Sequence, residues 1–413
     1  MSFAFPFANF FQPGVFWPAL ADIRPMQILA VLALLATLGR RASYNRMDAV
    51  AHPAAKWLLL FLFVQVISVY RSGLAAVASE FMDWLPYALF VLLSLRIITD
   101  GATLRSYVWG MMCGSAWIIL WGIYAVHAGL MGENGNRAGA YGMYENHNDY
   151  SFIIVQALPF FFIFWRNETS RLRRWFLMIA TVASIIGIFL SLSRGGMIAL
   201  VIEIVLIVWL TMGRRARLVL LPLVIAAGAA AISYQYIARA ANQGNDYTAE
   251  DAETSRYELW RAGENMLKAH PFLGVGSRTF GEHSTEYEEI SHDNLGKNAH
   301  NTFIEVAATS GLLGFGCFLL MIRGAIRETR KPRPGEDLVW ESRICTATLI
   351  ALATMCFRAM FDAKPWDWSF YVLATIAAAC GGMWKSRQMA RAAAADAQGV
   401  EGGEAAESDR LPA

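Results

Sequence analysis

Charged residues are scarce in this chain of 413 residues, of which Asp, Glu, Lys and Arg make up only 16%. Soluble proteins usually carry about 25%. Hydrophobic residues reach 56%, above the roughly 45–50% of an ordinary soluble chain. This composition argues against a water-soluble enzyme. The 35 Lys and Arg nearly balance the 33 Asp and Glu, so the net charge gives no reason to expect nucleic acid as a partner.

The polar segments also lack cysteine and the common catalytic motifs. All five cysteines fall inside apolar stretches, which supports neither a disulfide framework nor a cysteine-based zinc site; they are Cys113, Cys317, Cys345, Cys356 and Cys380. The sequence has no Walker loop, no Gly-x-Gly-x-x-Gly before a helix, no His-Glu-x-x-His and no Gly-x-Ser-x-Gly. It also has no Asp-x-Asp pair of the kind that holds a metal and a nucleotide sugar.

Long apolar runs dominate the rest of the chain. About 20 apolar residues cross a bilayer as a helix, and about eleven stretches approach that length: 17–38, 54–70, 83–97, 104–128, 150–165, 175–192, 196–212, 218–236, 301–322, 341–358 and 369–384. The segment 2–23 has no Lys or Arg, so it lacks the basic start of a signal peptide. It could lie outside the membrane, lie in the interface or form a twelfth short span. We therefore predict an all-α, polytopic membrane protein with about 11–12 transmembrane helices.

Basic residues are distributed unequally between the predicted loops. If the spans alternate, 23 of the 35 Lys and Arg fall on one side, which predicts that this side is cytoplasmic. The opposite side carries the long loop 237–299, in which eleven acids outnumber six bases. The predicted organisation is then N-terminal spans, a periplasmic loop, central spans, a long periplasmic catalytic loop, C-terminal spans and a disordered cytoplasmic tail, at 1–128, 129–149, 150–236, 237–299, 300–384 and 385–413.

The long loop has the pattern of a structured lid. Apolar residues recur at helical spacing from Tyr257 to Leu267, with Ser255 placed to cap a helix. We expect this helix to end near Ala269, before Pro271. Gly274 and Gly276 then predict a tight turn.

Arg194 lies in the short polar connection between two apolar spans, beside Ser193 and two glycines. A guanidinium there offers a permanently charged, multidentate match to phosphate, which predicts an anion site. The alternative is an arginine that reaches the interface for solvation alone.

His300 directly follows the acidic loop and begins a predicted span. Because the positive end of a helix disfavours imidazolium, we expect a neutral imidazole that can accept a proton. The alternative is a residue that only caps the helix. In the loop 129–149, Arg137, Asn146 and Asn148 are candidate ligands for sugar or phosphate, although the two asparagines could equally cap the following helix.

Four segments together resemble the signature of the O-antigen ligase and polymerase superfamily. They are Arg256-Tyr-Glu-Leu-Trp260, His270-Pro-Phe-Leu-Gly-Val-Gly276, Asn298-Ala-His-Asn-Thr-Phe-Ile-Glu305 and Ser310-Gly-Leu-Leu-Gly314. Upstream, Ser191-Leu-Ser-Arg-Gly195 is similar to a hairpin of that family, and Arg137, Asn146 and Asn148 fit its earlier loop. The likeness covers about residues 130–322.

The resemblance implies a GT-C-like fold with a helical periplasmic lid, in the inner membrane of a bacterium. It implies an inverting glycosyltransferase without metal or cofactor, which moves a glycan from undecaprenyl pyrophosphate to a hydroxyl of a glycan, of lipid A core or of a protein. Carried onto this sequence, Arg194 and Arg256 would bind the pyrophosphate and His300 would serve the acceptor hydroxyl. The residues Arg137, Asn146, Asn148, Arg261 and Asn301 are the candidate substrate ligands.

Four functions remain open from the sequence. An O-antigen ligase and a polymerase of O-antigen or exopolysaccharide repeat units share this chemistry and differ in the acceptor; ligase is preferred. A polysaccharide transporter is less consistent, because carriers usually place charges within their spans and here Glu203 is the main such case. A scaffold that binds a polymer without reaction is the remaining class. Membrane lipids are expected partners in every case.

Overall fold

The computed structural model describes residues 1–38, 52–131, 137–242, 249–330 and 339–408. Within these ranges every regular element is a helix and no β-strand occurs, which confirms the predicted all-α class. The α-helices are α1 (Ala4–Phe11), α2 (Pro13–Phe16), α3 (Pro25–Leu38), α5 (Pro53–Ser68), α6 (Leu74–Ile97), α7 (Gly101–His127), α8 (His147–Asn167), α9 (Arg171–Ser191), α10 (Arg194–Thr211), α11 (Arg214–Asn242), α12 (Ala249–Ala269), α13 (Phe280–Tyr287), α14 (Thr302–Arg330), α15 (Val339–Arg358) and α16 (Trp368–Ser408).

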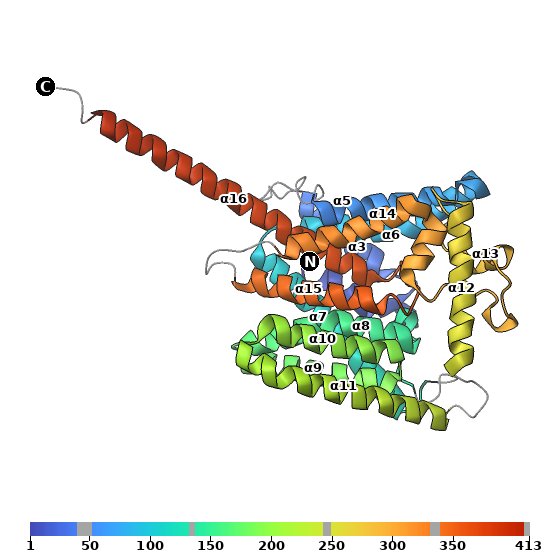
Figure 1. Cartoon of the computed structure of the whole chain (residues 1–413). Helices are drawn as coiled ribbons and strands as arrows, with labels where there is room; N and C mark the ends of the chain where they lie inside the picture. The colour runs from blue at the N-terminus through green and yellow to red at the C-terminus, as the bar shows by residue number, and fades with distance from the viewer. Residues whose placement is uncertain (39–51, 132–136, 243–248, 331–338, 409–413) are drawn as a thin grey trace.

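Eight of the described helices are long and apolar enough to cross a membrane: α5, α6, α7, α8, α9, α10, α11 and α14. The three other predicted spans overlap α3, α15 and the first part of α16, which lie in the same bundle (Figure 1). Each of the eleven predicted spans thus corresponds to one helix. The chain is a multi-pass helical membrane protein.

Helix α8 forms the centre of the bundle. It contacts α7, α9, α10 and α15, and its side chains from Asp149 to Phe161 are all buried. Helix α11 lies at the edge, next to α10 (Figure 1), and most of its described side chains are exposed. An apolar helix that is exposed in this way is suited to face lipid.

The first residues lie inside the bundle, alongside α7. The hydroxyl of Ser2 is 3.1 Å from that of Ser106 near the start of α7, and the ring of Phe16 is 4.9 Å from that of Trp121, centroid to centroid. A side chain at Gly110 would collide with the backbone of Phe3, so the glycine permits this close approach. The segment therefore runs parallel to α7 as an additional helical element packed against the bundle.

Helices α12 and α13 form a lid across one end of the bundle (Figure 1). Leu259, Met266 and Phe280 are buried in a small core of their own, which α14 completes with Ala308. The predicted end of α12 at Ala269 is confirmed. The predicted cap at Ser255 is wrong, because the helix already begins at Ala249; acidic residues just after that point suit a helix N-terminus.

Helix α14 is broken at Gly311, where the backbone adopts φ +62°. The segment 271–276 enters the break: the amide of Leu312 donates to the carbonyl oxygen of Pro271 at 2.7 Å, and the amide of Gly276 donates to Thr309 at 3.0 Å. A side chain at Gly311 would collide with the backbone of Phe272. The turn predicted at the two glycines is present, with φ +70° at Gly274 and +125° at Gly276, and it anchors the lid to a membrane helix.

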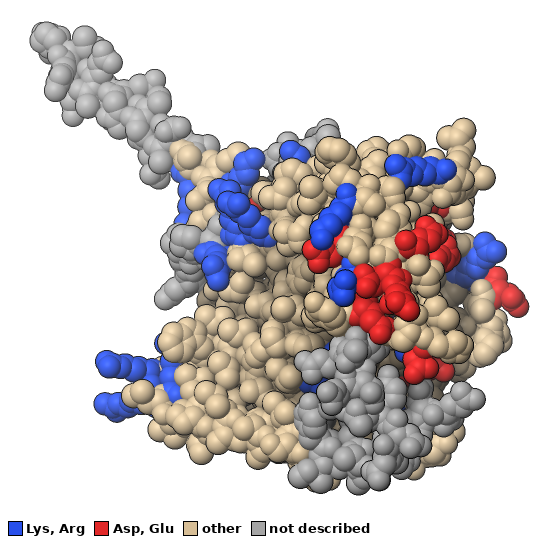
Figure 2. All heavy atoms as spheres, turned by 45° about the vertical axis from the view of Figure 1, so that its right-hand side comes forward, with Lys and Arg blue, Asp and Glu red and all other residues tan. Residues whose placement is uncertain are grey.

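Charge separates along the bundle axis. In Figure 2 the acidic side chains in view lie mainly on the side of the lid, whereas many basic ones lie at the opposite end. Helix α16 leaves the bundle from that basic end and extends to Ser408 (Figure 1). Here the structure differs from the predicted disordered tail at 385–413, since residues 385–408 are helical; their many alanines have the highest helix propensity. Residues 409–413 lie outside the described ranges.

Candidate functional site

His300 lies at the junction between the lid and α14, two residues before that helix begins. Its backbone is in the left-handed region, with φ +50°, a conformation that non-glycine residues seldom adopt. Next to it, Asn301 caps α14: its side-chain oxygen accepts from the amides of Phe303 at 3.0 Å and Ile304 at 3.2 Å. The capping interaction predicted as the alternative for His300 therefore belongs to Asn301, and the histidine side chain is left for another role.

The strained backbone at His300 is held by contacts to the preceding residue. The amide of Ala299 donates to Oε2 of Glu305 at 2.9 Å, and its carbonyl oxygen accepts from Nε1 of Trp260 at 3.0 Å. Glu305 is fully buried in the first turn of α14, and Trp260 comes from the lid helix α12. Both peptide groups that flank the α-carbon of Ala299 are thus held, and this sets the position of His300.

A cavity of about 410 Å³ lies beside His300. Three segments that are far apart in the sequence line it: the start of α8, the end of the lid and the loop between α15 and α16. The lining residues are Asn146, Asn148, Asp149, Gly296, Lys297, Asn298, His300, Asp362, Ala363 and Lys364. We call this the polar cavity, because most of these side chains can donate or accept hydrogen bonds.

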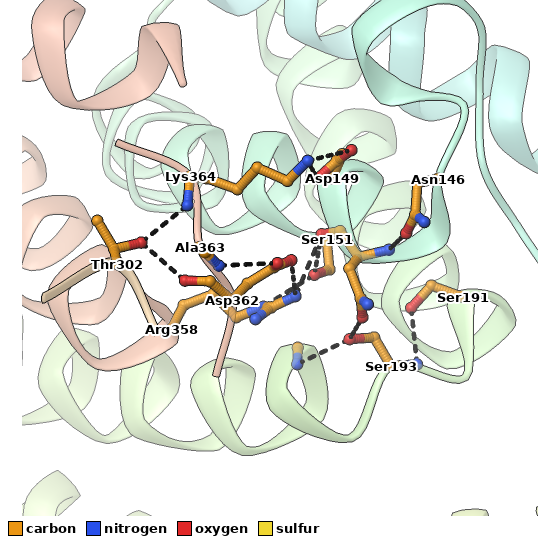
Figure 3. A network of polar contacts seen from close by, with 12 residues as sticks. Asn146, Asp149, Ser151, Ser191, Ser193, Thr302, Arg358, Asp362, Ala363 and Lys364 are labelled. Carbon is orange, nitrogen blue, oxygen red and sulfur yellow. Dashed lines mark hydrogen bonds and ion pairs between the residues drawn. The ribbon is translucent and has the colours of Figure 1, made fainter. Parts of the chain in front are cut away.

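Arg358 supports the polar cavity from the end of α15. Only 1% of its side chain is exposed. Figure 3 shows Arg358 between α8 and the loop that connects α15 to α16. Its Nε donates to Oγ of Ser151 at 3.1 Å, and its Nη2 donates to the carbonyl oxygen of Asn148 at 3.3 Å and to Oδ2 of Asp362 at 3.4 Å. A buried guanidinium with these three acceptors fixes the loop against α8.

The α15–α16 loop is also tied to α14 and α8 (Figure 3). Oγ1 of Thr302 donates to the carbonyl oxygen of Asp362 at 2.7 Å and accepts from the amide of Lys364 at 3.0 Å. The Nζ of Lys364 is 3.0 Å from the carboxylate of Asp149. Burial lowers the pKa of Lys364, but Asp149 and Asp362 outweigh this effect and raise it. Lys364 therefore stays protonated in the cavity at neutral pH.

The surroundings of His300 favour a neutral imidazole. Burial is the largest effect and lowers its pKa; the charges of Arg256, Lys297 and Lys364 lower it further, while Asp362 acts in the opposite direction. The sequence predicted the same protonation state from the helix dipole. In the structure, burial and neighbouring cations carry most of the effect. A neutral imidazole can accept a proton from a hydroxyl.

The two asparagines of the earlier loop line the polar cavity, and each also has a structural contact. The side-chain oxygen of Asn146 accepts from the amide of Asn148 and caps α8. The side-chain oxygen of Asn148 accepts from Oγ of Ser193 at 2.9 Å, and Ser193 in turn caps α10 through the amide of Gly196. Asn148 thus connects the cavity to the hairpin that presents Arg194.

Arg194 is the first residue of α10, and only two residues separate it from the end of α9. A side chain at the adjacent Gly195 would lie 3.2 Å from Nη1 of Arg358, so the hairpin lies against the support of the polar cavity. Arg137 braces the hairpin from the other side, because Nε and Nη2 donate to the carbonyl oxygens of Ser191 and Leu192, both at 3.2 Å. The predicted tight hairpin with small residues is confirmed.

Of the eight predicted site residues, His300, Asn146 and Asn148 line the polar cavity. The other five do not: Arg137, Arg194, Arg256, Arg261 and Asn301. Arg261 lies on the exposed side of α12, with 55% of its side chain accessible and its Nη2 3.6 Å from Glu288. Asn301 is buried under the start of α14. Arg256 lies in α12 and is close enough for its charge to lower the pKa of His300.

Sequence reasoning missed Asp149, Arg358, Asp362 and Lys364. Arg358 ends an apolar span and so carries the signal of an ionisable residue in a membrane helix, which marks a functional candidate. The other three lie in or beside segments that the topology placed at the outer face. Within the described residues no group of three His, Cys, Asp or Glu side chains is arranged to hold a metal ion.

A model of the family described as O-antigen ligase matches residues 179–319. This match supports the resemblance to the O-antigen ligase and polymerase superfamily. No curated protein matches the chain.

The matched O-antigen ligase segment holds Arg194, Arg256 and His300, and its signature motifs contact one another in pairs. Trp260 of the first motif bonds to Ala299 of the third, and the backbone of 271–276 fills the break at Gly311 of the fourth. The family match supports a ligase-type or polymerase-type membrane glycosyltransferase that acts on lipid-linked glycans in general. The four motifs, which are separate in the sequence, therefore lie together where the lid packs against α14.

Proposed function

We propose that this protein transfers a glycan from undecaprenyl pyrophosphate to an acceptor hydroxyl, as an O-antigen ligase. The observation that supports this most is His300, held by Trp260 and Glu305 through Ala299 at the wall of a cavity that also presents Lys297 and Lys364. A neutral base and two cations in one cavity, of which Lys364 is held by Asp149, suit attack by a hydroxyl and departure of an anion.

In the proposed reaction the acceptor oxygen attacks C1 of the sugar while His300 takes its proton. The bond from C1 to the pyrophosphate oxygen breaks, and the electron pair leaves with the pyrophosphate. Attack from the face opposite to the leaving group inverts C1. The negative charge that grows on the leaving group is stabilised by Arg194 and Arg256, with Lys297 and Lys364 as additional cations. Loss of one such preorganised donor typically costs roughly 10²–10³-fold in rate.

The proposed orientation follows from the charges. The basic end of the bundle would face the cytoplasm of a bacterial inner membrane, and the lid and polar cavity would face the periplasm. The periplasmic loops would then be 129–149 and 237–299. No metal or cofactor is part of the proposal.

The test is transfer by the purified full-length protein from a lipid-linked glycan. We expect His300→Ala, Arg194→Ala and Arg256→Ala to abolish transfer while the variants stay monodisperse in detergent. Lys268→Ala is the matched control on α12, since Lys268 is exposed and pairs with Glu264; it should retain wild-type activity. Near-normal transfer by the His300 variant would refute the assignment and favour a transporter or scaffold.

The acceptor is tested in cells that lack the gene. Accumulation of long lipid-linked polymer supports a ligase, because the finished chain then has no route off its carrier. Accumulation of single lipid-linked repeat units indicates instead a polymerase of O-antigen or exopolysaccharide repeats.

A further inference from the structure

A second cavity, of about 750 Å³, opens at the basic end of the bundle, opposite the lid. The first turns of α7, α9 and α15 and a later part of α16 surround it. Three arginines line it, together with two tryptophans and a glutamate: Arg105, Arg173, Arg387, Trp109, Trp340 and Glu341. We call it the basic-end cavity. The reaction proposed above uses none of these residues.

The carboxylates of this cavity are already engaged within the protein. Asp100 accepts from the amide of Thr103 at 2.8 Å and caps α7, and this bond lowers its pKa. Glu341 pairs with Nη2 of Arg387 at 3.2 Å. Neither carboxylate is therefore available to attract a cationic ligand.

Two arginines of this cavity, Arg105 and Arg173, each lie over the ring of a tryptophan. Arg105 has its guanidinium 3.7 Å from the ring centroid of Trp340 and contacts Glu168 at 3.3 Å through one nitrogen. Arg173 is 5.7 Å from the ring centroid of Trp109, and no carboxylate of the described residues forms an ion pair with it. A guanidinium on an aromatic face keeps its N–H edge directed outward for an acceptor.

We propose that the basic-end cavity binds the phosphate headgroup of an anionic phospholipid from the leaflet at that end. Arginine recognises phosphate through several hydrogen bonds, and tryptophan is enriched at the level of lipid headgroups. The cavity lies between helices of the membrane bundle, so a lipid reaches it from the bilayer. A zwitterionic lipid would bring an ammonium group for which no unengaged carboxylate remains, and this selects an anionic headgroup.

The test is native mass spectrometry of the delipidated full-length protein. The probes are phosphatidylglycerol, phosphatidylcholine with the same acyl chains, and glycerol phosphate as a headgroup without chains. The variants are Arg173→Gln and the double variant Arg105→Gln with Arg173→Gln. Arg174→Gln is the matched control, since it removes an exposed arginine next in sequence that does not line the cavity.

We expect the wild type and the control to retain one bound phosphatidylglycerol, and the double variant to lose it. The affinity of the double variant for phosphatidylglycerol should be at least about tenfold lower than that of the wild type. Arg173→Gln, at an exposed position, should weaken the same binding and serves if the double variant does not fold. Equal retention by wild type and Arg173→Gln would overturn the site, as would equal retention of phosphatidylcholine. Glycerol phosphate binding as tightly as phosphatidylglycerol would overturn the lipid as the source of the phosphate.

Discussion

Trp260 and Ala299 join the lid to the candidate site by one hydrogen bond, from the indole Nε1 to a main-chain oxygen 3.0 Å away. The indole comes from the middle of α12, and the acceptor precedes His300, whose backbone is left-handed. A shift of α12 would therefore move the peptide that sets the histidine. This contact couples the position of the lid helix α12 to that of His300.

Replacement of Trp260 by Phe keeps the ring and removes the donor. We expect kcat to fall about fivefold, because a typical hydrogen bond contributes about 1 kcal/mol, with little change in the KM for the lipid-linked donor. Steady-state transfer by the purified variant measures this. Trp175→Phe, at an exposed position on α9, is the control and should behave as wild type. Unchanged kcat for Trp260→Phe would contradict the coupling.

The rate should depend on pH through His300. Because its pKa is lowered in the folded protein, the neutral base is present at pH 7, and activity is lost only as the pH falls through that lowered value. Lys297→Gln removes a neighbouring positive charge, so the acidic limb of kcat/KM should move to higher pH. Asp362→Asn removes the opposing negative charge and should move the limb to lower pH.

A profile of kcat/KM against pH for the three proteins measures these shifts. We expect the acidic limb of Lys297→Gln and that of Asp362→Asn to move in opposite directions from the wild-type limb. Displacement in the same direction, or none, would show that another group controls the acidic limb.

Gly311 should be intolerant of any side chain. Its φ of +62° disfavours L-residues, and a Cβ there would collide with the backbone of Phe272. We expect Gly311→Ala to lower the unfolding temperature in detergent by several degrees. Gly316→Ala in the same helix is the control, because nothing lies within 4 Å of its added Cβ and alanine favours a helix. Equal unfolding temperatures for the two variants would show that the break of α14 at Gly311 is not required for the stability of the fold.

Chelation should leave transfer unchanged, since the proposed mechanism draws its positive charge from side chains. Transfer measured with and without EDTA tests this. A complete loss that a divalent metal restores would replace the arginine-based mechanism with a metal-based one.

The sequence by itself determined the membrane architecture. Spans can be located from apolar runs because the bilayer requires about 20 apolar residues per helix, and each of the eleven predicted spans has its helix. The ordered motifs around Arg256, His270, His300 and Ser310 predicted the resemblance that the family match at residues 179–319 supports. The pattern from Tyr257 onward predicted the lid helix and its end. These are local properties of the chain.

Only the tertiary structure decided which polar side chains meet. Arg358, Asp362 and Lys364 reach the polar cavity because the α15–α16 loop is bound to Thr302 and Asp149, residues more than 60 and more than 200 positions away along the chain. No periodicity encodes such a contact. For the same reason Arg261 looked like a ligand and lies on the exposed side of the lid, and Asn301 caps a helix. A membrane span is specified by a continuous run of apolar residues, which the sequence shows directly. A polar site is formed by residues that are distant in the sequence, so it depends on how the helices pack.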